Sequence, residues 1–215
     1  MVGNTAIKPN TGEGYEVVAV NYWKSANNEF KRIMLDFWNT LLLIHDSLEF
    51  KEIVGFLNKI PYPGKIMYIS LTKTNDAIKP HFKNLKSKIF VIDCVSSMIF
   101  EKKGTQDCLF EQAPSNLKEM LELIEKDLKN IKPDIIILDS LSQFIDFSSI
   151  STLKGRELYD FLDYLKSRYS RTPHKFILLY DNILSKELAN LPTTGVDVIL
   201  KYEVIMGRVD WKDDV

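Results

Sequence analysis

The stretch Lys132-Pro-Asp-Ile-Ile-Ile-Leu-Asp-Ser-Leu-Ser142 decides the fold. Its centre is apolar and rich in isoleucine, as in a strand that is covered on both faces of a parallel sheet. Immediately upstream, residues 117–131 carry apolar side chains at helical spacing, and Asn116 with Glu119 predicts a capping-box-like helix start. The sequence therefore predicts a helix that leads through a proline into a buried strand.

The same alternation of short apolar runs with amphipathic segments continues in both directions and is typical of βα units. Apolar periodicity predicts further helices at residues 30–37, 50–57 and 158–169. Residues 100–114 predict a loop with a short edge strand, and residues 184–195 predict a loop. The predicted strands are 40–45, 65–71, 88–93, 134–139 and 175–181, with 15–22 and 196–202 extending the sheet at its edges. We expect an α/β domain with a mainly parallel central sheet and helices on both faces.

Composition excludes several classes of protein. The 215 residues are 45% hydrophobic and 27% charged, with a net charge of −1, which excludes a disordered or fibrous chain. Cys94 and Cys108 form no disulfide framework, and neither a signal-like N-terminus nor an apolar run of membrane-spanning length is present. We expect one domain over residues 1–215, located in the cytoplasm.

Three segments carry a family resemblance. Lys132 to Ser142 resembles the Walker B strand of the RecA/KaiC superfamily, and the stretches 63–71 and 88–94 resemble its neighbouring strands. The resemblance covers about residues 38–204, so residues 1–37 are an N-terminal extension with a strand and a short helix. It implies a three-layer RecA/KaiC-like fold of the P-loop NTPase type, similar to archaeal KaiC-like proteins of unassigned function, a group that commonly lacks the nucleotide-binding motif.

The chain departs from this family at the nucleotide site. A Walker A loop needs glycines, a lysine and a Ser or Thr, but His45-Asp46-Ser47-Leu48-Glu49 has neither glycine nor lysine and carries two acids. The general-base glutamate that the resemblance implies after the second strand is replaced by Thr72-Lys73-Thr74. Phosphoryl transfer depends on positioning and charge neutralisation, so we expect a degenerate, non-catalytic relative of the ATPases without a cofactor.

A few polar residues at predicted strand ends remain candidates for a ligand-binding edge, because α/β sheets bind ligands at the carboxyl ends of their strands. Clustered carboxylates there would suit Mg²⁺, whereas the competing interpretation, which we favour, is that they cap turns and helices. The three histidines follow no metal-ligand spacing, so no metal site is predicted and the histidines are interpreted as incidental. The candidates are Asp46, Ser47, Asp93, Asp139 and Ser140.

Charge is distributed unevenly along the chain. Residues 51–90 contain eight lysines and two acids, whereas residues 101–163 contain thirteen acids and eight bases. Opposite patches suit self-association or a charged protein partner, while the plainer alternative is a solvated surface. The leading hypothesis is a domain that acts through protein contacts in regulation or signalling. The alternatives are an atypical ATP and Mg²⁺ site that uses Asp139, and nucleic-acid binding by the lysine-rich segment.

Overall fold

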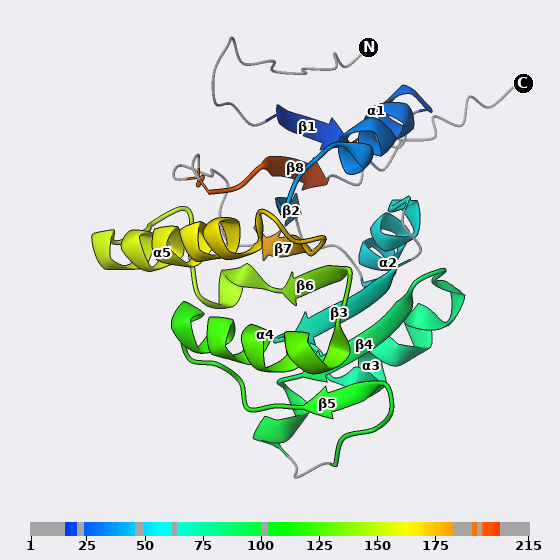
Figure 1. The fold of residues 1–215 in the computed structure, drawn as a ribbon, viewed down its shortest axis with the longest axis vertical. Helices are drawn as coiled ribbons and strands as arrows, with labels where there is room; N and C mark the ends of the chain where they lie inside the picture. The colour runs from blue at the N-terminus through cyan, green and yellow to red at the C-terminus, as the bar shows by residue number, and fades with distance from the viewer. Residues whose placement is uncertain are drawn as a thin grey trace, which may run out of the picture.

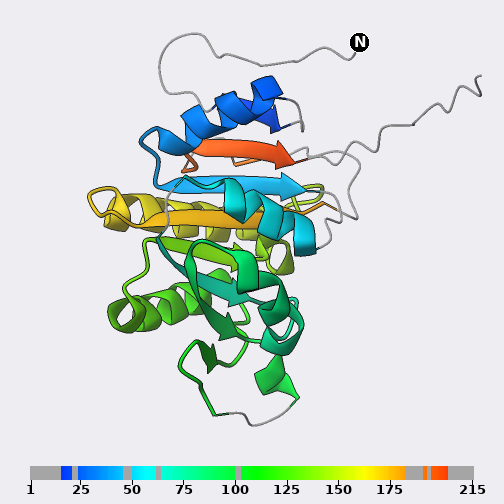
Figure 2. The ribbon, with the colours of Figure 1, turned by 90° about the vertical axis from the view of Figure 1, so that its right-hand side faces the viewer.

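The computed structural model describes residues 16–20, 24–45, 50–61, 64–99, 103–182, 191–192 and 195–202. They form one parallel sheet of eight strands in the order β1-β8-β2-β7-β6-β3-β4-β5. The strands stack from β1 at one edge to β5 at the other (Figure 2). Their bounds are β1 Glu16–Val20, β2 Thr40–His45, β3 Lys65–Ser70, β4 Lys88–Asp93, β5 Cys108–Phe110, β6 Ile135–Asp139, β7 Lys175–Asp181 and β8 Val198–Tyr202.

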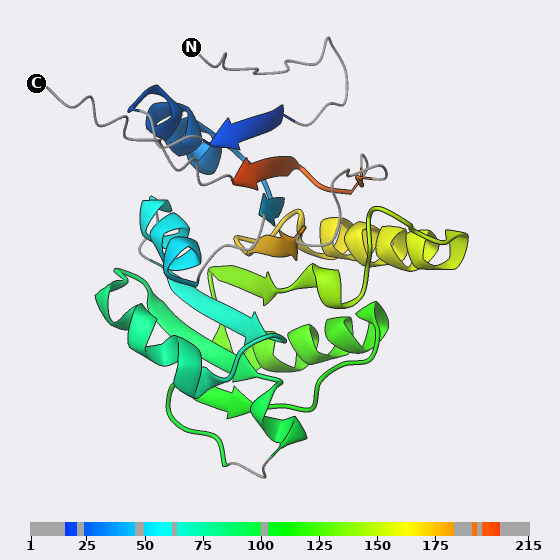
Figure 3. The same ribbon diagram turned by 180° about the vertical axis from the view of Figure 1, so that it is seen from behind.

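Helices cover both faces of the sheet, which makes three layers. Figure 1 shows α4 and α5 in front of the strands, and Figure 3 shows α1, α2 and α3 on the opposite side. Short 3-10 segments follow α3, β4 and β6. The helical elements are α1 Lys24–Leu35, α2 Phe50–Lys59, α3 Asn75–Ile78, η1 Lys79–Asn84, η2 Ser96–Met98, α4 Leu117–Ile131, η3 Leu141–Gln143 and α5 Thr152–Tyr169.

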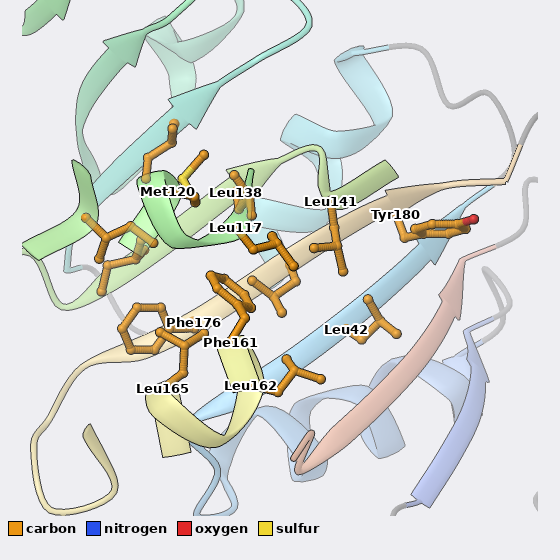
Figure 4. Close-up of a cluster of buried hydrophobic side chains, with 14 of the residues drawn as sticks. Leu42, Leu117, Met120, Leu138, Leu141, Phe161, Leu162, Leu165, Phe176 and Tyr180 are labelled. Carbon is orange, nitrogen blue, oxygen red and sulfur yellow. The ribbon is translucent and has the colours of Figure 1, made fainter. Parts of the chain in front are cut away.

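The sheet separates two apolar clusters, because successive side chains of a strand point to opposite faces. On one face, leucines and aromatic residues of α4 and α5 pack on β2, β6 and β7, as Figure 4 shows. On the other face, α1, α2 and α3 pack on the alternate residues of the same strands. Strands buried on both sides must be apolar throughout, which is why the short runs were recognisable in the sequence.

The ends of the predicted strands, of α2 and of α4 agree with the structure within about two residues, a normal disagreement at element ends. The predicted helices 30–37 and 158–169 begin too late, because α1 starts at Lys24 and α5 starts at Thr152. The strand predicted at 196–202 is β8, which lies between β1 and β2 and not at an edge of the sheet. The edge strands β1 and β5 and the start of α4 are confirmed: Asn116 Oδ1 accepts from Glu119 N at 2.9 Å, and Glu119 Oε2 accepts from Ser115 N at 2.7 Å. The inclusion of Phe37 in the first helix is wrong. α1 ends at Leu35, and Phe37 is 87% exposed. The predicted loop at 184–195 lies mostly outside the described residues.

The described helices include none that is both long and apolar enough to span a membrane.

Candidate ligand-binding edge of the sheet

The carboxyl ends of five central strands bring five polar side chains to one edge. Ser70 is in register with both Asp139 and Asp93, and His45 is in register with Asp181. The residue two positions before each of them belongs to the cluster under α1, α2 and α3, so all five point to that face. The row consists of His45, Ser70, Asp93, Asp139 and Asp181.

Asp139, the central residue of this row, is 3% exposed and is held by a tyrosine. The Tyr68 hydroxyl donates to Asp139 Oδ2 at 2.5 Å. Burial, reinforced by the charge and hydrogen bond of Asp139, raises the pKa of Tyr68 well above its usual value. The phenol therefore stays protonated and remains a donor to the carboxylate. Sequence reasoning missed Tyr68, although strand alternation places it on the same face as Ser70.

Ser140 closes the turn that follows β6. Its hydroxyl donates to Leu179 O on β7 at 3.1 Å and accepts from Ser142 N at 3.2 Å. It also hydrogen bonds the Ser142 hydroxyl, and the Asp139–Ser140 peptide bond is cis. Ser140 is buried, so these contacts join β6 to β7 and shape the 3-10 turn at 141–143.

Asp93 is fully buried and accepts four hydrogen bonds from its own chain. Asn75 N and Ser96 Oγ donate to Oδ2 at 2.6 and 2.7 Å, and Val95 N and Ser96 N donate to Oδ1 at 2.9 and 2.8 Å. Burial by itself raises the pKa of this carboxyl, but the hydrogen bonds from Asn75, Ser96 and Val95 outweigh it, and the pKa is lowered. Asp93 therefore anchors the start of α3 and the turn after β4.

The remaining sequence candidates, Asp46 and Ser47, lie outside the described residues. The helix that follows them begins at Phe50, whose ring packs edge-on against Tyr68 with centroids 5.9 Å apart. Phe82, from the 3-10 segment after α3, lies against both rings at 5.4 and 5.5 Å. Aromatic side chains thus cover the buried phenol that holds Asp139.

His45 and Asp181 form a second pair that the sequence did not indicate. His45 Nδ1 lies 4.0 Å from Asp181 Oδ1, and the histidine is 3% exposed. Each residue ends a predicted strand, but the sequence did not show that β2 and β7 are neighbours, and only that pairing brings the two side chains together. Across the described part of the chain, no group of three or more His, Cys, Asp or Glu side chains is arranged to hold a metal ion. The expectation that the domain uses no cofactor stays a prediction.

Two lysines of the lysine-rich segment make contacts within the chain. Lys79 pairs with Asp107 at 2.8 Å, and the ammonium of Lys73 lies 5.7 Å from the Phe50 ring centroid. Lys83, Lys86 and Lys88 are exposed along η1 and the start of β4. These three lysines are the basic positions of the segment best placed to meet a partner.

Comparisons with known proteins reveal similarity at the level of structure. No protein-family model matches the chain, and no curated protein matches it. Among solved structures, it is similar to a KaiC-like protein of the hyperthermophilic archaeon Pyrococcus horikoshii OT3, with 14% identity and a TM-score of 0.42 over 76% of this chain and 72% of that one. The predicted three-layer α/β architecture is confirmed by the parallel sheet itself and its flanking helices.

Proposed function

We propose that this chain is a non-catalytic RecA/KaiC-like domain that acts through protein contacts of a regulatory or signalling kind. The observation that carries the proposal is the use of the polar groups at the carboxyl edge. Asp93 accepts four hydrogen bonds from its own chain, and Asp139 accepts one from the buried Tyr68. These hydrogen bonds engage both oxygens of Asp93 and one oxygen of Asp139 in the fold, which favours a structural role over coordination of a Mg²⁺ ion.

The sequence of the turn between β2 and α2 supports the same proposal. Asp46 and Glu49 place two negative charges where a helix N-terminus normally attracts an anion, and no lysine stands in the turn. Repulsion from these carboxylates would oppose a triphosphate. A domain that has the sheet but no phosphate-binding loop would act by binding other proteins through its surface.

Isothermal titration with ATP and with ADP, each in the presence of Mg²⁺, tests the proposal that the domain is non-catalytic. We expect no heat of binding and no release of phosphate over long incubation. Micromolar binding with turnover that disappears in Asp139→Asn, while the variant keeps its far-ultraviolet circular dichroism spectrum, would overturn the proposal in favour of an atypical nucleotide site.

Sedimentation equilibrium tests self-association, the contact that the opposite charge patches favour. We expect association that weakens as salt rises, because exposed charges are screened. Reversing both Lys83 and Lys86 to glutamate should weaken it further, whereas the same reversal of Lys166 and Arg168, exposed on α5 outside both charged segments, is the matched control. A monomer that persists at high concentration and low salt would contradict self-association as the contact.

A further inference from the structure

The opposite edge of the sheet contains a cavity that the proposed function does not use. It lies where β2, β3, β6 and β7 begin and has a volume of about 460 Å³. This is within the range of pockets that enclose small organic ligands. The walls that matter here are formed by Phe37, Trp38, Gly64, Asp134, Pro173 and Lys175.

Most of the cavity wall is apolar, and one aromatic side chain stands exposed beside it. Trp38 is 2% exposed and forms part of the core, whereas Phe37, its neighbour in the chain, is 87% exposed. A phenyl ring in water at a cavity mouth contributes nothing to the core. Covering it with an apolar ligand would be favourable, because the driving force scales with apolar area removed from water.

Lys175 supplies a positive charge inside this apolar setting. Its Nζ lies 4.2 Å from the centroid of the Trp38 ring, a cation–π contact. Burial lowers the pKa of the Lys175 ammonium, so its charged form has lost part of its hydration. A negatively charged ligand beside it would stabilise that charged form.

Among the described residues of the wall, the one carboxylate is that of Asp134, and the backbone already uses it. Asp134 Oδ2 accepts from Lys65 N at 2.7 Å. Gly64 lies directly against this carboxylate, since a Cβ at that position would be 2.7 Å from Oδ2. Asp134 therefore fixes the entry of the chain into β3, and Lys175 is the charge that distinguishes the cavity.

We propose that this cavity binds a small apolar anion, an aromatic or aliphatic body that carries one carboxylate or sulfonate. Phe37, Trp38 and Pro173 contact the body, and Lys175 binds the acid group. The site is distinct from the carboxyl edge and does not depend on the function proposed above.

The test uses a matched pair of fluorescent probes with the full chain. Anilinonaphthalene sulfonate carries the negative charge, and N-phenylnaphthylamine has the same rings without it. We expect saturable binding of one sulfonate per chain and binding of the neutral probe that is weaker by roughly ten- to hundredfold, the usual effect of a charged hydrogen bond. Energy transfer from Trp38, in a Trp23→Phe, Trp211→Phe background, locates the probe at the cavity.

Variants of the lysine separate charge recognition from folding. Lys175→Met should reduce sulfonate affinity to that of the neutral probe, Lys175→Arg should retain most of it, and Lys118→Met should behave as the wild type. Circular dichroism of each variant checks the fold. Equal affinity for both probes in the wild-type chain, or unchanged sulfonate affinity in a folded Lys175→Met, would overturn the proposal. The comparison of the two probes needs only the wild-type chain, so it tests charge recognition even if Lys175→Met does not fold.

Discussion

At the carboxyl edge of the sheet, buried carboxylates accept hydrogen bonds from the backbone and from Tyr68, whereas at the amino edge Lys175 lines an apolar cavity beside the exposed Phe37. The first edge has the polar residues usually associated with ligands, yet Asp93 and Asp139 already accept hydrogen bonds from the rest of the domain. The second edge lies away from the usual ligand position of an α/β sheet. The difference teaches that the type of residue at an edge indicates less about binding than the partners it already has.

The largest expected loss of stability follows from a substitution at the carboxyl edge. Asp93→Ala removes the acceptor of four hydrogen bonds, three of them buried, and we expect a loss of about 3–5 kcal/mol in the free energy of unfolding, measured by urea denaturation. Because folding lowers the pKa of Asp93, the stabilisation that it provides is present above the unfolded pKa and is lost as pH falls through the folded one. Asp160→Ala, an exposed matched control on α5, should stay within about 0.5 kcal/mol of the wild type.

Loss of the Tyr68 hydroxyl tests whether Asp139 is structural. Tyr68→Phe leaves Asp139 Oδ2 without its donor, and we expect a destabilisation of about 1–3 kcal/mol. A double-mutant cycle with Asp139→Asn measures their coupling. If Tyr68→Phe left the free energy of unfolding unchanged and showed no coupling to Asp139→Asn, Asp139 would be available to a ligand. The contrast between the two edges would then fail.

A third buried carboxyl sharpens the contrast, because it lacks the donors that Asp93 has. Asp127 on α4 is 1% exposed, and neither of its oxygens has a hydrogen-bond partner among the described residues. Burial, followed by the charge of Glu111, raises the pKa of this carboxyl, although Lys126 opposes the shift. The folded chain therefore binds more protons than the unfolded chain between the two pKa values. Stability should fall as pH rises from about 4, the unfolded value, through the folded pKa.

Asp127→Asn removes the buried charge. We expect it to raise the free energy of unfolding at neutral pH by about 1–2 kcal/mol and to abolish this part of the pH dependence. Asp160→Asn serves as the control on an exposed helix position. A loss of stability in Asp127→Asn at neutral pH would show that the ionised carboxylate is favourable in the folded state.

The smallest effect is expected at the amino edge. Phe37→Ser replaces a side chain that is almost completely exposed, so the free energy of unfolding should change by no more than about 0.5 kcal/mol. The same variant should bind both naphthalene probes more weakly, because it lacks part of the apolar wall. A large loss of stability would show that Phe37 serves the fold, and the two edges would then resemble each other.

Much of the fold was predictable because the central strands are buried on both faces and appear in the sequence as short apolar runs. The short helical elements α3, η1, η2 and η3 were missed, since three to six residues are too few to show a helical period. Phe37 continued the apolar spacing of Phe30, Ile33 and Met34, but the chain leaves the helix after Leu35. The apolar period alone does not show where the helix ends.

The candidate site was predictable only in part. Asp93 and Asp139 were placed at the correct edge, because the carboxyl ends of parallel strands meet there. The hydrogen-bond partners of these two residues were not predicted, because Tyr68 reaches Asp139 only through the pairing of β3 with β6. His45 and Asp181 likewise meet because β7 lies beside β2.

The sequence by itself determined the three-layer α/β architecture, because each apolar strand demands cover on both faces and each amphipathic helix has one face to bury. It also determined that the turn after β2 lacks the residues of a phosphate loop. Only the tertiary structure decided which strands are neighbours, which carboxylates receive hydrogen bonds and where Lys175 meets Trp38. Those outcomes depend on contacts between residues distant in the chain, and local patterns of polarity do not specify such contacts.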